Sequence, residues 1–179
     1  MPEVNGSVVR GLSVSDEVQD AVDRIVQQWK VERPDVDVSP MAVIGRIGRA
    51  ASVLDKRIQA VLAEFSLQPG EFDLIATLRR TGSPHRLTVG QLLDNSMVTS
   101  GAVTHRLNRL TEKGLIEREV DPANRRVVIV QLTPEGVAAV DAALPAHVAN
   151  EEALLTSLTR DERRQLATLL KRLLLDIQQ

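Results

Sequence analysis

Hydrophobic positions recur along most of the chain at spacings of three and four residues, which predicts a succession of amphipathic helices. Proline or a small hydroxyl residue stands at the start of most of these segments, as expected for first-turn and N-cap positions. Ser15 is the expected cap of the first helix, and Trp29 closes its apolar stripe. The expected helices cover residues 15–29, 39–65, 69–81, 89–93, 99–113, a segment that follows residue 136, and 159–177.

One stretch follows a different pattern. Residues 115–120 and 127–132 are rich in β-branched residues, and the polar segment 121–126 between them contains Asp, Pro and Asn, which favour turns. The sequence therefore predicts one strand pair, a hairpin whose protruding tip carries Arg125 and Arg126. The expected fold class is mainly α with a small β-hairpin wing.

The order of a short helix, a turn, a second helix and a hairpin is that of a winged helix-turn-helix. In the second helix, Val103, Leu107 and Leu110 are spaced to face a core. Its other positions are side chains that hydrogen-bond to base edges or phosphates, as a recognition helix requires. The candidate DNA-binding residues are Thr99, Ser100, Thr104, His105, Asn108, Arg109, Arg125 and Arg126. The alternative reading of this helix is an ordinary amphipathic surface helix.

Charge is zoned along the chain. The formal net charge is −2, which excludes the nonspecific coating of nucleic acid seen with very basic proteins. Residues 1–38 carry a net charge of −4 and residues 127–179 a net charge of −2, whereas 39–98 and 99–126 each carry +2. A basic centre is consistent with an anion-facing surface there, although shifts of two charges decide nothing alone.

Composition excludes several other classes of function. The 179 residues contain no Cys, so thiolate metal sites and thiol redox switches are excluded, and the three His are too scattered to suggest a metal site. The sequence shows no phosphate-binding loop or nucleophile–base motif, so we expect neither an enzyme nor a cofactor. It also shows no membrane span or signal peptide, so a soluble, cytoplasmic protein without a membrane partner is expected.

Three motifs in order give a more specific indication. The segments TSGAVTHRLNRLTEKGLIER (99–118), DPANRR (121–126) and VQLTPEG (130–136) resemble the DNA-binding core of MarR-type regulators. The resemblance, which extends over roughly residues 40–178, implies a homodimer whose terminal helices interlock and whose two recognition helices read a pseudo-palindromic operator in double-stranded DNA. The family wing usually reads Asp-Pro-x-Asp-Arg-Arg, whereas Asn124 here lacks the charge expected to orient a wing arginine.

The resemblance also implies a division of the chain into four parts. These are an N-terminal extension helix, a dimerisation helix, the winged helix-turn-helix core and C-terminal dimerisation helices, at residues 1–38, 39–68, 69–133 and 134–179. The extension and ERPDVDVSPMAVIGRIGR (32–49) resemble the branch of the family that answers to urate, xanthine, aconitate or citrate-like acids.

By that resemblance, the ligand-binding residues are Trp29, Asp73, Arg106 and Arg118. Their chemistry suits an anionic ligand, because arginine offers bidentate donors and an indole offers a flat apolar wall with one N–H. In the unliganded state an Asp73–Arg118 ion pair could tie the ligand site to the DNA-binding part. A purely structural ion pair, with Trp29 in the core, is the alternative.

The sequence thus predicts a repressor released from DNA by a small anionic metabolite, either a tricarboxylate such as aconitate or citrate, or a purine such as urate. The alternative function is a winged-helix protein-interaction or structural module without ligand sensing. The residues do not choose the ligand class, the operator sequence or the regulated genes, nor whether the wing compensates for Asn124.

Overall fold

The computed structural model describes residues 19–98, 101 and 103–178, which form two compact units. The first unit ends at Ala51, and the second runs from Ser52 to Gln179. Helix α2 (Pro40–Glu64) belongs to both units, with its first half in one and its second half in the other.

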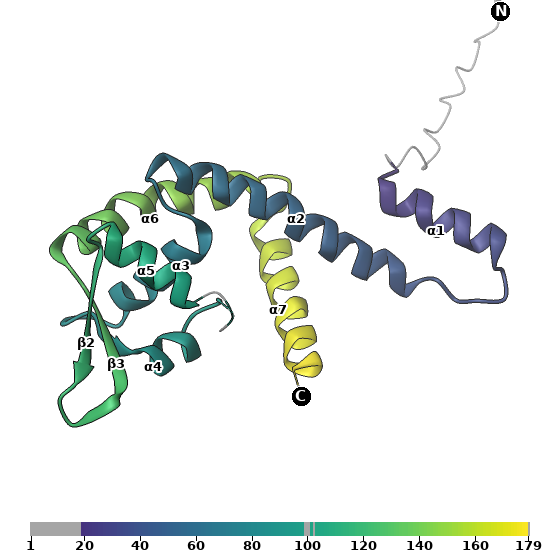
Figure 1. The fold of residues 1–179 in the computed structure, drawn as a ribbon. Helices are drawn as coiled ribbons and strands as arrows, with labels where there is room; N and C mark the ends of the chain where they lie inside the picture. Colours follow the sequence, from purple (N-terminus) through teal and green to yellow (C-terminus); the bar gives the residue numbers. More distant parts are fainter. Residues whose placement is uncertain (1–18, 99–100, 102, 179) are drawn as a thin grey trace, which may run out of the picture. The chain divides into compact units, whose positions relative to one another are not determined.

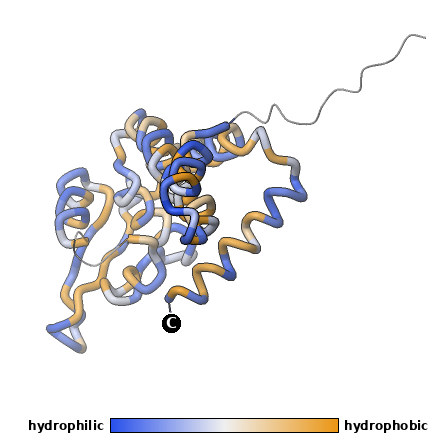
Figure 2. The backbone as a smooth tube through the Cα atoms, turned by 90° about the vertical axis from the view of Figure 1, so that its right-hand side faces the viewer, coloured by the Kyte–Doolittle hydropathy of each residue, from blue (hydrophilic) through white to orange (hydrophobic). Residues whose placement is uncertain are grey.

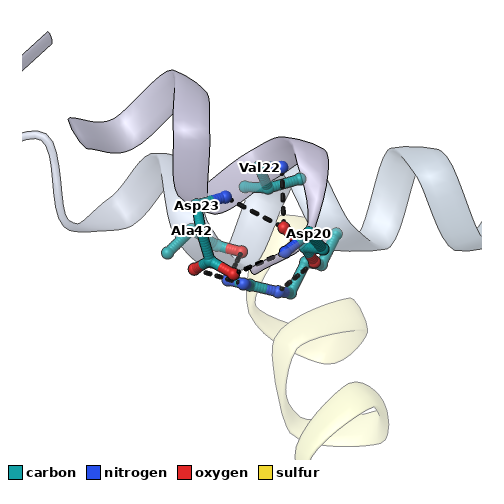
Figure 3. A network of polar contacts seen from close by, with 5 residues as sticks. Asp20, Val22, Asp23 and Ala42 are labelled. Atoms are coloured by element: carbon teal, nitrogen blue, oxygen red, sulfur yellow. Dashed lines mark hydrogen bonds and ion pairs between the residues drawn. The ribbon is translucent and has the colours of Figure 1, made fainter. Parts of the chain in front are cut away.

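The first unit holds α1 (Ala21–Glu32) against the start of α2 (Figures 1 and 3). Asp20 caps α1, so the expected start at residue 15 is wrong for this helix, and Ser15 lies outside the described residues. The guanidinium of Arg46 on α2 contacts Asp20 at 3.0 Å and Asp23 at 2.6 Å. Gly45 permits this close packing, because a Cβ there would lie only 3.1 Å from Cγ1 of Val22.

The second unit is a bundle of helices with a small sheet at one end (Figure 1). After α2, its elements in chain order are α3 (Pro69–Arg80), β1 (Arg86–Thr88), α4 (Val89–Asp94), α5 (Val103–Glu112), β2 (Ile116–Asp121), β3 (Asn124–Leu132), α6 (Pro134–Leu154) and α7 (Arg160–Ile177). The expected helices after residue 39 are all present among the described residues, with bounds that differ by a few residues.

The sheet differs from the expected strand pair in two ways. It has three antiparallel strands in the order β1-β3-β2, because the short segment 86–88 pairs with β3. Strand β3 also begins at Asn124, so Arg125 and Arg126 lie in a strand and not in the turn. The backbone pairs Asp121 with Asn124, which shortens the tip of the hairpin to two residues. An ion pair between Arg86 and Glu119 crosses over β3 and joins the two outer strands.

One hydrophobic core holds the second unit together. Leu74, Ile75 and Leu78 of α3 are fully buried at its centre. Leu107 and Leu110 of α5 reach the same core from their side. Helix α5 is therefore packed against α3, and it also contacts β2.

The ends of these helices are fixed by local hydrogen bonds. Thr88 and Thr159 each form a capping box with the residue three positions later, at the starts of α4 and α7. Thr133 caps α6, and Gly114 ends the turn after α5 with a φ of 69°, a conformation that glycine adopts without strain. The sequence signals at Thr88, Thr159 and Gly114 were therefore sufficient to place these helix ends, whereas α6 begins at Pro134, before the segment that was expected to follow residue 136.

Helix α7 contains no buried residue. Most of its large apolar side chains are exposed, with fractions of 42–67% for Leu166, Leu169, Leu174 and Ile177. Figure 2 shows apolar and polar residues alternating along this helix toward the C-terminus, as expected for an amphipathic helix.

No helix within the described ranges is long and apolar enough to cross a membrane. In the same ranges, no group of three or more His, Asp or Glu side chains is arranged to hold a metal ion.

Candidate nucleic-acid interface and ligand residues

Helix α5 has two distinct faces. Val103, Leu107 and Leu110 are buried, with at most 5% of each exposed, and anchor the helix in the core. The opposite face is exposed and polar, and it carries Thr104, His105 and Asn108. Thr99 and Ser100, also expected at the DNA, lie outside the described residues. The exposed face therefore has the chemistry that base and phosphate contacts require.

The C-terminal end of α5 is held by a buried carboxylate on α3. Glu71 is fully buried, and its Oε2 accepts a hydrogen bond from Nζ of Lys113 at 2.7 Å. Nε of Arg109 lies 2.8 Å from Oε1 of Glu71, as an ion pair. Arg109, expected at the DNA, thus has its guanidinium beside Glu71. Lys113 also donates to the carbonyl of Ser66, at the end of the preceding turn.

Glu71 is ionised in this environment. Burial raises the pKa of its carboxyl. The hydrogen bonds from Lys113 and from the N–H of Gln68, together with the charges of Lys113 and Arg109, lower this pKa by more than burial raises it. The net result is a pKa below the usual value for glutamate. Sequence reasoning missed this residue, although a Glu two positions after Pro69 is a visible capping signal, and Glu71 does accept the Gln68 N–H.

The wing turn is capped by its own polar side chains. Oδ1 of Asp121 accepts the N–H of Ala123 at 2.8 Å, and Oδ1 of Asn124 accepts the N–H of Arg126 at 3.1 Å. Asn124 thus supplies the acceptor that an Asp would supply at this position, without its charge. Arg125 and Arg126 are both exposed just beyond the turn.

Arg106 lies against the start of α3. A Cβ at Gly70 would lie 2.4 Å from Nε and 2.7 Å from Cζ of Arg106, so the guanidinium rests on the bare glycine backbone. Nη1 of Arg106 is buried and has no hydrogen-bond partner among the described residues. A buried donor left unpaired is costly, and such groups are rare in proteins.

Asp73 and Arg118 have separate partners. Oδ2 of Asp73 accepts the backbone N–H of Met97, at 2.7 Å, in the turn between α4 and α5. Nη1 of Arg118 donates to Oδ1 of Asn108 on α5, at 2.8 Å. No ion pair joins the two residues in the part of the chain that the structure describes, so the Asp73–Arg118 pair considered from the sequence is not formed in this structure.

The position of Arg118 follows from the strand register. Residues directly opposite in an antiparallel pair share a face of the sheet, and Arg118 stands opposite the buried Val130. Alternation along β2 also puts it on the side of Ile116, which faces the core. This register directs Arg118 toward α5, where it meets Asn108.

Trp29 lies on α1 in the first unit, whereas the other three expected ligand residues lie in the second. Its side chain is 44% exposed and, with Ile25, lines an open apolar hollow on α1. Trp29 is not a core residue of its own unit.

Comparison with known proteins gives a consistent result. The model of the MarR family matches residues 67–128. The HTH-type transcriptional regulator PecS of Dickeya dadantii is 38% identical over 165 residues, which cover 92% of this chain and 95% of PecS.

Solved structures agree with this match. A mutant of MarR from E. coli complexed with operator DNA is 26% identical, with a TM-score of 0.66 over 82% of this chain and 97% of that one. Sco3205 of Streptomyces coelicolor, a MarR family transcriptional regulator in complex with DNA, has a TM-score of 0.72 at 22% identity, over 80% of this chain and 94% of that one.

Proposed function

The chain belongs to the MarR family of winged-helix transcriptional regulators, which bind DNA, and from this premise we propose a more specific function. The protein is a repressor that reads a pseudo-palindromic operator as a homodimer. A small anionic metabolite, either a tricarboxylate such as aconitate or citrate or a purine such as urate, releases it from the DNA.

The observation that carries the DNA-binding part is the division of α5 into two faces. Three buried apolar residues fix the helix, and the exposed face presents Thr104, His105 and Asn108. Hydroxyl, imidazole and amide groups are suited to base edges and phosphates, and the exposed Arg125 and Arg126 of the wing add two cations.

The proposal that the protein forms a homodimer rests on α7. A helix with no buried residue and an exposed apolar row buries that row only against another surface. A second copy of the chain would cover it by a two-fold contact, which is the commonest symmetry of oligomers.

The proposal that the protein responds to a ligand rests on Arg106. Its Nη1 is buried without a partner, so an anion that accepted this donor would satisfy it. Arg106 lies on the recognition helix, so its engagement by an anion would bias the orientation of that helix. Asp73 on α3, Arg118 on β2 and Trp29 on α1 are the other residues that we propose for ligand binding.

DNA binding is tested with a labelled fragment that covers the region upstream of the protein's own coding sequence. Fluorescence anisotropy should give an affinity at least a hundredfold higher than that for a scrambled fragment of the same length. Affinity should fall steeply with salt, because neutralised phosphates release counterions. Equal affinity for both fragments would instead favour a winged-helix module that does not read DNA.

The ligand response is tested by titrating urate, xanthine, citrate and trans-aconitate separately into the protein. Trp29 is the single tryptophan, so its fluorescence reports on α1 alone. One of these compounds should both change the fluorescence and lower the affinity for DNA. If none of the four does so, the ligand classes named here are wrong.

A further inference from the structure

Two side chains of α3 contact the backbone of the turn that leads into α5. Oδ2 of Asp73 accepts the N–H of Met97 at 2.7 Å, and Nη2 of Arg80 donates to the carbonyl of Asn95. Asp73 and Arg80 are seven residues apart, which is two helical turns, so both project from one side of α3. Their partners are only two residues apart in the turn.

Among the described residues, the carbonyl of Asn95 and the N–H of Met97 have no helical partner at the end of α4. Other groups of the same turn are satisfied locally, since the N–H and the side-chain amide of Asn95 both donate to the carbonyl of Gln91. The carbonyl of Asn95 and the N–H of Met97 obtain side-chain partners from α3 instead. One acidic and one basic side chain thus match one backbone donor and one backbone acceptor.

We propose that Asp73 and Arg80 form a two-point clamp that positions the recognition helix through the backbone of residues 95–97. Two hydrogen bonds of opposite direction fix both the position and the rotation of this short segment, whereas one bond would leave the rotation open. The charge on each side chain strengthens its bond. Asp73 is a positioning residue in this role, because it acts on the DNA through the turn.

The clamp also deepens the proposed function, on which it rests. Asp73 cannot hold the N–H of Met97 in the same geometry and also turn toward a bound ligand. An anion placed next to Asp73 would repel its carboxylate, and a ligand donor would compete with Met97 for it. Either event breaks the hydrogen bond between Asp73 and Met97. Ligand binding would therefore change the position of the recognition helix through the backbone at Met97.

The clamp predicts how variants distinguish operator from nonspecific DNA. Asp73→Ala and Arg80→Ala should each lower the affinity for the operator about tenfold, roughly 1.4 kcal/mol, and leave the affinity for a scrambled fragment unchanged within about twofold. Asp73→Asn keeps an oxygen acceptor for Met97 and should recover most of the loss. The amide of Met97 should exchange with deuterium faster in Asp73→Ala than in the wild type or Asp73→Asn.

Arg79→Ala is the matched control. Arg79 precedes Arg80 on α3 but pairs with Asp141 on α6, so its removal takes the same charge without touching the turn. Its operator affinity should stay within about twofold of the wild type. If Arg80 contacted a phosphate instead, Arg80→Ala would lower the affinity for the operator and for the scrambled fragment equally. It would also reduce the slope of log affinity against log salt concentration by about one.

Wild-type operator affinity in Asp73→Ala, equal losses in Arg79→Ala and Arg80→Ala, or equal loss on both fragments would each overturn the clamp. Failure of the wild type itself to prefer the operator would instead overturn the proposed function. Circular dichroism and the melting temperature of each variant identify any loss that comes from misfolding.

Discussion

The guanidinium of Arg106 lies over Gly70, so closely that a Cβ at position 70 would come within 2.4 Å of Nε. This relationship joins the recognition helix to the first turn of α3 without a hydrogen bond between the two residues. It requires glycine at position 70, because any larger side chain would occupy the space of the arginine.

Gly70→Ala should therefore displace the guanidinium of Arg106 and weaken the ligand response while leaving the fold intact. The far end of a long side chain moves at little cost, and alanine is a better helix former than glycine. The melting temperature should stay level or rise slightly as the ligand-induced loss of DNA binding weakens. Gly48→Ala is the control, because a Cβ there meets no atom within 4 Å. A Gly70→Ala variant with a wild-type response would show that the position of Arg106 does not matter.

Glu71→Gln tests the buried charge at the other end of α5. Glutamine keeps the Gln68 cap and an acceptor for Lys113 but removes the charge, so we expect a loss of about 1–2 kcal/mol of unfolding free energy at neutral pH. The loss should be modest, because Lys113 and Arg109 are partly exposed and can be hydrated.

The sign of the pH dependence follows from the lowered pKa of Glu71. A carboxyl whose pKa is lower in the folded state stabilises the fold above its unfolded value, here 4.5, and loses that contribution as pH falls through the folded value. The difference in stability between the wild type and Glu71→Gln should be largest above pH 4.5 and shrink below it. Urea unfolding at several pH values measures it, and a constant difference would contradict an ionised Glu71.

Gly136→Ala should be strongly destabilising. Gly136 is buried in the first turn of α6, and a Cβ there would lie 2.0 Å from the carbonyl oxygen of Leu115. Because the clash would be with backbone, it can be avoided only if α6 or the start of the hairpin moves. We expect this shift to lower the free energy of unfolding by about 1–3 kcal/mol or more. Gly90→Ala, whose Cβ would meet only Oγ1 of Thr88 at 3.9 Å, should leave the melting temperature nearly unchanged. Equal melting temperatures for the two variants would contradict this packing.

Arg125→Ala should weaken binding to operator and scrambled DNA alike. A wing arginine that contacts phosphate or the minor groove contributes mainly through charge, so the slope of log affinity against log salt should decrease by about one. Arg33→Ala, which removes an exposed arginine paired with Asp35, should leave the slope unchanged. A loss confined to the operator would instead indicate that Arg125 reads sequence.

The sequence by itself determined the helical elements of the second unit, including the division of α5 into an apolar and a polar face. Periodicity, caps such as Thr88 and Thr159, and the turn glycine at position 114 act within a few residues, so their effect can be read locally. The same local rules placed the wing turn at residues 121–126, although Asn124, Arg125 and Arg126 belong to β3.

Only the tertiary structure decided the partners of the polar side chains. Strand β1 is three residues long and forms because β3 offers it a partner, which no local pattern indicates. Asp73 binds the N–H of Met97 and Arg109 lies beside Glu71 for the same reason, since residues distant in sequence meet only when α3 packs against α4 and α5. The family resemblance nominated Asp73 and Arg106 as ligand-binding residues, but the contacts through which each would act arise from packing.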